Sequence, residues 1–475
     1  MSAALDAARS ALHGARAWLV GGAVRDRAIG RATADVDIVV DGDPGEAARA
    51  IARAAGRAAC FALSEEFGSW RVVARGGAWQ IDVEPLRGES IEADLALRDF
   101  TVNAIAEPLG GGEAIDPLGG LSDLRAHRLR MAAQAAFADD PLRVLRLVRL
   151  AVELELEPEA QTLRAAAAHA GGLRDVSAER VFAELRRVIA SPRVRWGLEM
   201  MSSLGATAVV LPELEALRGV EQNRFHHLDV HGHTLEVLDR TVELTGAGLD
   251  DGVGGDMQAT LGVHRAEVQA LLSEPLADEM TRGEALRWGA LLHDAAKPLT
   301  REVRADGRVT FIGHDARGAK LAREILERLR ASERLRAHVA ALVSSHLRLG
   351  FLVHEPQPLA RRTLFAYLRA CSPVEVDVTL LSVADRLATR GDRAQEAIDA
   401  HLRLVEDVLA GALRWRADGP PGPLLRGDEL ARELGIATGP QVGELLEDLA
   451  AAQYAGELST RAEAIAHARA FLDLA

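Results

Sequence analysis

A segment near the N-terminus, LVGGAVRDRAIGRATADVDIVV, combines features that bind phosphate and divalent metal ions. Glycines 21 and 22 follow a short apolar run, and glycines at the start of a helix let backbone N–H groups approach a phosphate closely. Arg25, one helical turn later, can neutralise that phosphate. Asp35 and Asp37 are two residues apart in a predicted strand, so their carboxylates project from one face. Such a pair can hold the Mg²⁺ ions that activate an attacking hydroxyl and stabilise a leaving pyrophosphate.

Three more motifs follow in the chain: LALRDFTVNAIA, DPLGGLSDLRAHRLR and FADDPLRVLRLVRL. With the first segment, in this order, they resemble the motifs of class II tRNA nucleotidyltransferases and bacterial poly(A) polymerases, within the polymerase-β-like superfamily. The resemblance covers roughly Leu19 to Ala190. It implies template-independent transfer of nucleotides from CTP or ATP to the 3′ end of tRNA, with release of pyrophosphate by a two-metal mechanism.

The resemblance also assigns roles to single residues. It makes Asp35 and Asp37 the catalytic Mg²⁺ ligands. It places a further set of side chains and one glycine on the nucleotide: Gly22, Arg25, Arg98, Asp140, Arg143, Arg146 and Arg149. Within this set, Asp140 and Arg143 match the pair that reads the base. A carboxylate can accept from the exocyclic amine that C and A share, and a guanidinium can donate to the ring acceptors.

The sequence departs from the family pattern at two places. Asp139 stands where the family has Glu. Its side chain is shorter, and we expect this difference to change little. After the predicted strand WQIDVEPL, full CCA-adding members carry a longer flexible loop that is associated with the switch from C to A. Here the connection is reduced to little more than RGES. We therefore expect an enzyme that adds two cytidines, with complete CCA addition as the alternative. Asp82, in the same strand, is either a third acidic group beside the metals or a structural residue.

A second constellation lies downstream. A His-Asp doublet in ALLHDAAKP, with a histidine before it and an aspartate after it, resembles the HD superfamily of metal-dependent phosphohydrolases. Neutral imidazoles and carboxylates that converge on divalent ions generate a hydroxide near neutral pH. The expected ligands are His233, His293, Asp294, His314, His346 and Asp385. His226, His227 and His231 lie near enough in sequence to compete with His233.

Such a ligand set implies phosphodiesterase or phosphatase activity on tRNA ends with Mg²⁺, Mn²⁺ or Ni²⁺. Two alternatives remain for the whole chain. One is a poly(A) polymerase that uses only ATP. The other is an HD phosphohydrolase whose N-terminal half merely binds RNA.

Composition limits the remaining possibilities. The chain has 475 residues and a net charge of −14, which argues against indiscriminate binding of nucleic acid. Between Leu124 and Leu198, however, the chain has thirteen Arg but only nine Asp and Glu together, and we expect RNA or nucleotide contacts there. Only Cys60 and Cys371 are present, so metal ligands must be His and carboxylate. The chain lacks a long apolar run, and we expect a cytoplasmic protein without membrane contact.

Hydrophobic periodicity predicts a module that mixes strands with helices, followed by helices alone. Together with the resemblance, this implies an α+β multidomain fold: a polymerase-β-like head with a mixed sheet, then an all-helical neck, HD domain and tail. We expect strands at AWLVGG, DVDIVV, SWRVVA and WQIDVE, a helix at EAARAIARAAG, and helices alone after about Asp139. The Gly-rich stretches near 245–257 and 416–427 are the expected linkers. The predicted domains are the head (1–138), a neck for base recognition and RNA binding (139–215), the HD domain (216–415) and a C-terminal helical segment (423–475).

Overall fold

The computed structural model describes residues 2–32, 35–64, 68–223, 226–244, 260–391 and 394–474. The chain forms two compact units, Met1–Val210 and Leu211–Ala475. Each unit is described by itself. The four-domain division remains a prediction, and the expected linker near 245–257 lies outside the described residues.

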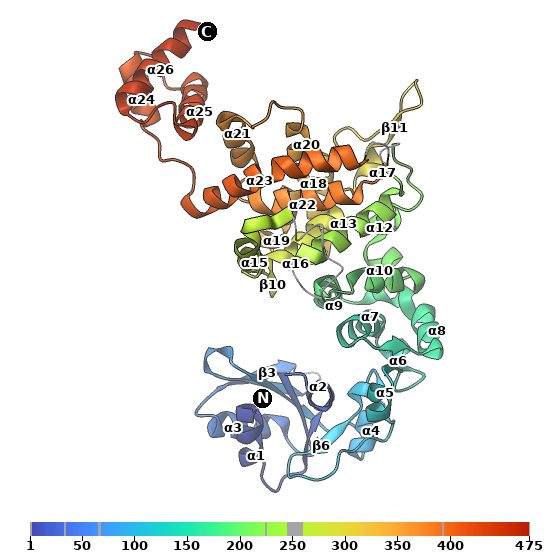
Figure 1. The fold of residues 1–475 in the computed structure, drawn as a ribbon. Helices are drawn as coiled ribbons and strands as arrows, with labels where there is room; N and C mark the ends of the chain where they lie inside the picture. Colours follow the sequence, from blue (N-terminus) through green and yellow to red (C-terminus); the bar gives the residue numbers. More distant parts are fainter. Residues whose placement is uncertain are drawn as a thin grey trace. The chain divides into compact units, whose positions relative to one another are not determined.

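The first unit is built on a mixed sheet of six strands in the order β3-β4-β5-β2-β1-β6 (Figure 1). β2 and β5 run parallel, and the other neighbours are antiparallel. The strands are β1 (Ala17–Val20), β2 (Asp35–Val40), β3 (Ala59–Ser64), β4 (Ser69–Val73), β5 (Gln80–Pro85) and β6 (Ala106–Pro108). The predicted strands and mixed sheet are confirmed. β3 was not predicted. It lies at the edge of the sheet with Phe61 and Leu63 exposed, so its residues do not show the alternation of a half-buried strand.

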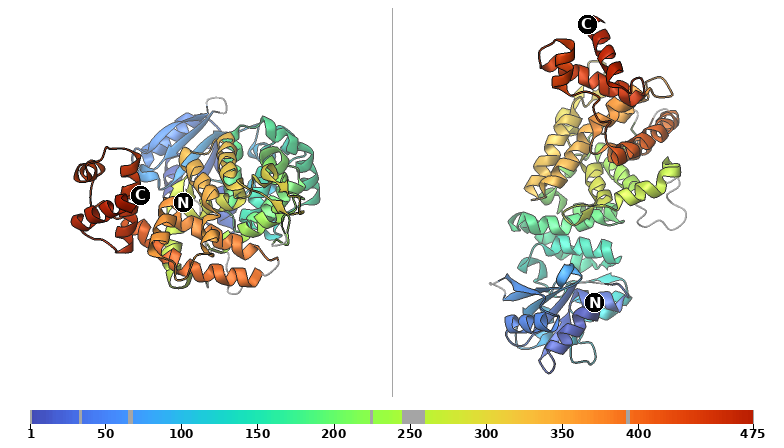
Figure 2. Two further views of the ribbon diagram at one scale, coloured as in Figure 1. Left: turned by 90° about the horizontal axis from the view of Figure 1, so that it is seen from above. Right: turned by 90° about the vertical axis from the view of Figure 1, so that its left-hand side faces the viewer.

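Helices cover one face of this sheet and continue the unit. α1 (Ser2–Ala11) and α3 (Pro44–Ala54) lie side by side on it, as the right view of Figure 2 shows. The remaining elements of the head are α2 (Gly22–Ala28), η1 (Arg75–Gly77), α4 (Ile91–Ala96), η2 (Thr101–Asn103), α5 (Gly120–Arg125) and β7 (Arg128–Leu129). They are followed by α6 (Ala136–Asp139), α7 (Arg143–Leu154), β8 (Glu157–Pro158), α8 (Ala160–His169), η3 (Ala170–Asp175), α9 (Ala178–Ala190), α10 (Val194–Ser203) and α11 (Thr207–Val210).

The second unit is a helical body whose helices α13, α16, α18, α19 and α22 surround the HD residues. Its first part comprises α12 (Pro212–Glu215), α13 (Val230–Leu244), η4 (Gly262–His264), α15 (Arg265–Leu272), β9 (Pro275–Ala277), β10 (Met280–Thr281), α16 (Arg282–Leu292), α17 (Lys297–Thr300), β11 (Glu302–Val303) and β12 (Val309–Thr310). Its second part comprises α18 (His314–Arg328), α19 (Glu333–Ser345), α20 (Arg348–Leu352), α21 (Arg361–Cys371), α22 (Glu375–Ala388) and α23 (Ala394–Asp418). The expectation of helices alone after Asp139 was too strict. Short strand pairs interrupt them, such as β11 and β12 around the turn residue Gly307, whose φ of 80° suits glycine.

The chain ends in α24 (Gly427–Leu434), α25 (Pro440–Ala455) and α26 (Arg461–Leu474), which share a small apolar core of their own. Pro440 opens α25, and Gly435 closes α24 in the left-handed conformation. Both cysteines are free thiols. Among the helices of the described residues, none is long and apolar enough to cross a membrane.

Candidate active site and metal centre

The head site lies on the sheet face opposite α3. Trp70 faces α3, where it packs against Gly45. Because side chains alternate along a strand, its neighbour Arg71 projects from the other face, together with Asp82, its partner across β4 and β5. The parallel register places Asp37 beside Asp82. The predicted acidic pair of β2 therefore shares its face with further acidic and basic groups.

The surroundings of Asp37 disfavour its charged form. Burial, followed by the charge of Glu84, raises the pKa of Asp37 to about 6. Arg98 opposes this shift, while Asp82 and Asp35 add to it. A buried carboxylate among other carboxylates is poorly stabilised without a cation. This arrangement suits a divalent metal ion at Asp35 and Asp37.

Asp82 has a partner of its own. Nε and Nη2 of Arg71 donate to its two carboxylate oxygens, each at 2.7 Å. Such a bidentate pair is strong and fixed in geometry. Asp82 is thus held by Arg71 in this structure, whereas Glu84, which sequence reasoning missed, affects Asp37 more strongly. Alternation along β5 from Asp82 would have placed Glu84 on this face.

The glycine turn brings the start of α2 to the acidic face. Gly21 has φ of 67°, and its N–H donates to the carbonyl oxygen of Ile105. A Cβ on Gly21 would lie 3.1 Å from Nη1 of Arg98 and 3.5 Å from Oδ2 of Asp37. The turn, the arginine and the aspartate therefore meet at one point. Gly22 begins α2 on the far side of this turn.

Arg25 is buried and already partly neutralised. Its Nε donates to Asp26 at 2.8 Å, and its Nη1 donates to the side-chain oxygen of Asn103 at 2.5 Å. Asn103 also donates to Asp99. Asn103 thus joins Arg25 of α2 to Asp99 of the RDFTVN motif, a connection that sequence reasoning did not find.

The predicted base-reading residues begin the helical part of the first unit. Arg143 donates to the backbone carbonyls of Leu97 at 3.0 Å and Ala136 at 3.2 Å. Asp140 accepts from Nη2 of Arg180 at 2.7 Å, so it is paired with α9. The two side chains are held by different partners.

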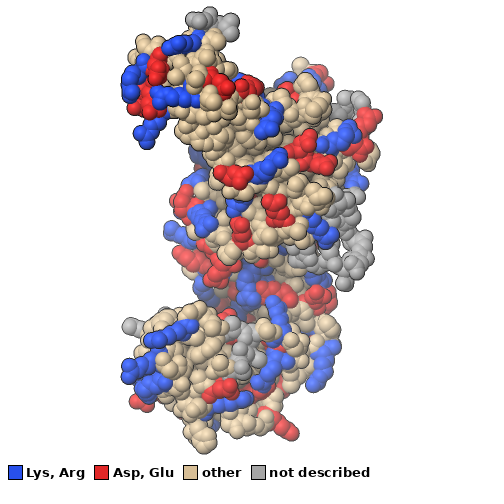
Figure 3. All heavy atoms as spheres, turned by 60° about the vertical axis from the view of Figure 1, so that its left-hand side comes forward, with Lys and Arg blue, Asp and Glu red and all other residues tan. Residues whose placement is uncertain are grey.

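Arg146 and Arg149 follow on α7 with different surroundings. Arg146 lies 2.9 Å from Oδ2 of the buried Asp99. Arg149 is buried and donates to Glu184 at 2.5 Å and to Glu153 at 3.0 Å. Because the guanidinium of Arg149 is paired with these two carboxylates, we expect a structural role for this residue rather than contact with the nucleotide. Many arginines of the Arg-rich segment are paired in this way, and Figure 3 shows basic and acidic side chains interspersed over one face.

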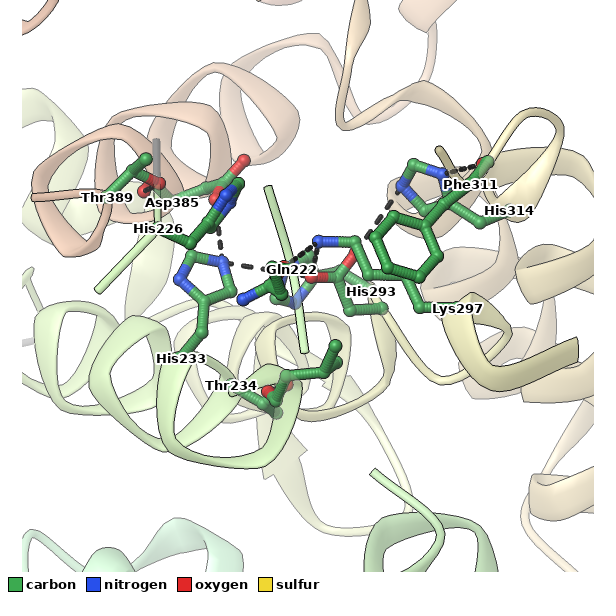
Figure 4. A network of polar contacts seen from close by, with 12 residues as sticks. Gln222, His226, His233, Thr234, His293, Lys297, Phe311, His314, Asp385 and Thr389 are labelled. Atoms are coloured by element: carbon green, nitrogen blue, oxygen red, sulfur yellow. Dashed lines mark hydrogen bonds and ion pairs between the residues drawn. The ribbon is translucent and has the colours of Figure 1, made fainter. Parts of the chain in front are cut away.

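In the second unit, the structure brings together all the expected HD residues. His233 comes from α13 and Asp385 from α22, while the doublet follows α16 (Figure 4). Two groups can each hold a metal ion: His233 with His293 and Asp294, and Asp294 with His314 and His346. The distances from Asp294 to His293 Nε2 and His314 Nε2 are 3.1 and 3.4 Å, through different oxygens. Asp294 belongs to both groups and would contribute a ligand oxygen to each.

The histidines are oriented for metal binding. Nδ1 of His293, His314 and His346 each lies 2.7 to 2.8 Å from a backbone carbonyl three residues earlier. A proton on Nδ1 leaves the Nε2 lone pair for a metal ion. Nε2 of His233 and of His293 and Oδ2 of Asp294 are buried, and among the described residues they contact other charged groups of the site without forming a well-aligned hydrogen bond. Burial, then the charge of His293, lowers the pKa of His346 to about 4, which keeps it neutral. These groups fit divalent metal ions.

Among the competing histidines, His233 reaches Asp385 at 3.0 Å, whereas His226 packs its ring against that of His233. Burial, then the charge of Lys297, lowers the pKa of His226 to about 3. Lys297 is a site residue that sequence reasoning missed. Its Nζ lies 2.6 Å from Asp294 and donates to Gln222 at 2.6 Å. Its spacing of three from Asp294 on a helical turn was the available signal.

Known proteins match this chain over most of its length. Family models match residues 17–130 (poly A polymerase head domain), 155–217 (probable RNA and SrmB-binding site of polymerase A) and 263–390 (HD domain). The A-adding tRNA nucleotidyltransferase of Deinococcus radiodurans is 39% identical over 94% of this chain and 94% of its own. The chain belongs to the tRNA nucleotidyltransferase family. It is an enzyme, and nucleotidyl transfer is its class of reaction.

Other relatives within the family carry a different specificity. The CC-adding tRNA nucleotidyltransferase of Thermus thermophilus is 34% identical over 96% of this chain and 93% of its own. The solved structure of the Thermotoga maritima CCA-adding enzyme with tRNA matches with a TM-score of 0.61 at 19% identity, covering 98% of this chain and 95% of that one. This last likeness shows the shared fold. The predicted head, helical region and HD domain are confirmed.

Proposed function

We propose that the head adds cytidines to the 3′ end of tRNA without a nucleic-acid template. The observation that carries this proposal is the meeting of the Gly21 turn, Arg98 and Asp37 on the acidic face of the sheet. Asp35 and Asp37 would hold Mg²⁺, which activates the tRNA 3′-OH and stabilises pyrophosphate when bound. Gly22, Arg25 and Arg98 would face the triphosphate. Asp140, Arg143 and Arg146 would contact the base and sugar of CTP.

The short connection after β5 supports cytidine addition rather than a C-to-A switch. Leu86 N–H donates to Val40, and Arg87 donates to Asp94 through its backbone at 3.2 Å and its side chain at 3.1 Å. Ser90 caps α4 by accepting from Ala93. The connection is thus short and bound at both ends. The activities of the relatives differ, however: one is A-adding and another is CC-adding. Terminal A addition to CC-ended tRNA is therefore the second candidate.

For the HD site we propose hydrolysis of phosphate esters at tRNA ends. The observation that carries it is Asp294, whose two oxygens face the two histidine groups. Mg²⁺, Mn²⁺ or Ni²⁺ held there would supply a hydroxide near neutral pH. A water oxygen bonds to phosphorus while the bond from phosphorus to a ribose oxygen breaks, and that oxygen takes the proton.

Two paired variants test both proposals. Asp35→Ala with Asp37→Ala should abolish CTP incorporation and leave hydrolysis of 2′,3′-cyclic phosphate intact. His293→Ala with Asp294→Ala should do the reverse. Incorporation that survives the first pair would refute the head assignment, and hydrolysis that survives the second pair would refute the HD assignment.

A further inference from the structure

The pocket that contains the HD residues has two chemically different walls. Its volume is about 530 Å³. One wall carries ligand side chains, namely Asp294, His314, His346 and Asp385. The other is apolar and comes from the segment between β12 and α18 and from the region of α20, namely Phe311, Ile312, Leu347 and Phe351.

Two of these apolar side chains are exposed at the pocket. Ile312 is 70% exposed and Phe351 is 65% exposed, although both line a pocket that contains a buried polar centre. Ligand sites join an apolar surface to a few convergent polar groups in this way. An exposed aromatic ring offers a flat face on which any nucleobase can stack.

Positive charge lies between the two walls. Nζ of Lys297 lies 5.4 Å from the centre of the Phe311 ring and also contacts Asp294. Arg386 lines the same pocket, and within the described part of the chain it forms no ion pair with an acidic side chain. A phosphate between the metal ligands and these cations would leave its nucleoside toward the apolar wall.

We propose that this pocket binds a whole nucleotide, with the phosphate on the metal-ligand wall and the base against Phe351 and Ile312. This inference rests on the proposed phosphohydrolase function and adds a determinant of substrate choice to it. Phe351 and Ile312 then select nucleotides over other phosphate esters, without selecting one base over another, because stacking tolerates every base.

The test is calorimetric titration of the full chain in Mn²⁺ with 2′-AMP and with ribose 2-phosphate, which lacks the base. Asp35→Ala with Asp37→Ala is the background, so that the head does not contribute. We expect 2′-AMP to bind more tightly than ribose 2-phosphate. Phe351→Ala should weaken 2′-AMP binding about tenfold and leave the affinity for ribose 2-phosphate unchanged, because the substitution removes only the stacking contact with the base. Phe351→Trp should retain tight binding.

Val303→Ala is the matched control, because Val303 is 57% exposed but does not line the pocket. Equal affinities for the two ligands, or an equal loss of both in Phe351→Ala, would overturn the inference. A preference for 2′-AMP without any hydrolysis of cyclic phosphate would support the pocket and refute the phosphohydrolase proposal. Hydrolysis of cyclic phosphate without a preference for 2′-AMP would support the phosphohydrolase proposal and refute the nucleotide pocket.

Discussion

The backbone of Gly21 lies directly against the carboxylate of Asp37, since a Cβ on Gly21 would be 3.5 Å from Asp37 Oδ2. Gly21→Ala would also have to adopt φ near 67° and would press on Arg98. We expect loss of CTP incorporation and a fall in unfolding free energy of about 1–3 kcal/mol, measured by denaturant titration. Gly30→Ala is the control, because Gly30 has a similar φ of 72° and open space around its Cα. If both variants incorporate CTP equally, the contact has no functional role.

The raised pKa of Asp37 predicts a conflict between stability and function. An acid whose folded pKa exceeds its unfolded pKa makes its full stabilising contribution below the unfolded pKa, about 4 for Asp, and loses it as the pH rises from there through about 6. Asp37→Asn should therefore increase the unfolding free energy of the metal-free protein at pH 7.5 by on the order of 1–3 kcal/mol, and so raise its Tm. The same substitution should abolish CTP incorporation. The Tm gain should be smaller at pH 5 and should vanish below about pH 4. A Tm that falls at pH 7.5 would contradict the account.

A related prediction concerns metal competition at the same carboxylate. Because protonation of Asp37 and metal binding exclude each other, CTP incorporation at limiting Mg²⁺ should decline as pH falls through about 6. Raising the Mg²⁺ concentration should move this decline to lower pH. An acid limb that does not respond to Mg²⁺ would assign the titration to another group.

Arg149 is predicted to act in stability alone. Removing it leaves the partly buried carboxylates of Glu153 and Glu184 with reduced compensation, so Arg149→Met should lower the unfolding free energy by about 2–3 kcal/mol. The KM for CTP should stay unchanged at a temperature where the variant is folded. Arg195→Met removes a more exposed ion pair with Glu199 and should cost less than about 1 kcal/mol. A raised KM for CTP in Arg149→Met would return this residue to the nucleotide site.

The shared position of Asp294 predicts the metal content of the HD site. Measured by metal analysis in the Asp35→Ala, Asp37→Ala background, the chain should bind two Mn²⁺ ions, and Asp294→Ala should bind neither. His314→Ala with His346→Ala should bind one, because His233 and His293 remain with Asp294. One ion in the parent and none in the last variant would exclude the bridged arrangement.

Local patterns predicted much of this architecture. Strand periodicity located β1, β2, β4 and β5, and the His-Asp doublet with its flanking residues located the HD cluster. Contacts between distant residues were beyond such reasoning. Helical spacing placed Arg146 and Arg149 on one face of α7, but only the packing of α9 brings Glu184 to Arg149. Likewise, Arg71 pairs with Asp82 because β4 lies beside β5, a neighbour relation that no motif encodes.

The most direct test of the central claim is incorporation of labelled CTP and ATP into tRNA transcripts that end at the discriminator base, after C, and after CC. We predict addition of two cytidines to the first transcript, one to the second and no addition of A to the third. Completion to CCA would show that the short connection after β5 permits the switch. Refusal of CTP with addition of A to the CC-ended transcript would contradict the account and establish terminal A addition, and untemplated runs of A would indicate a poly(A) polymerase.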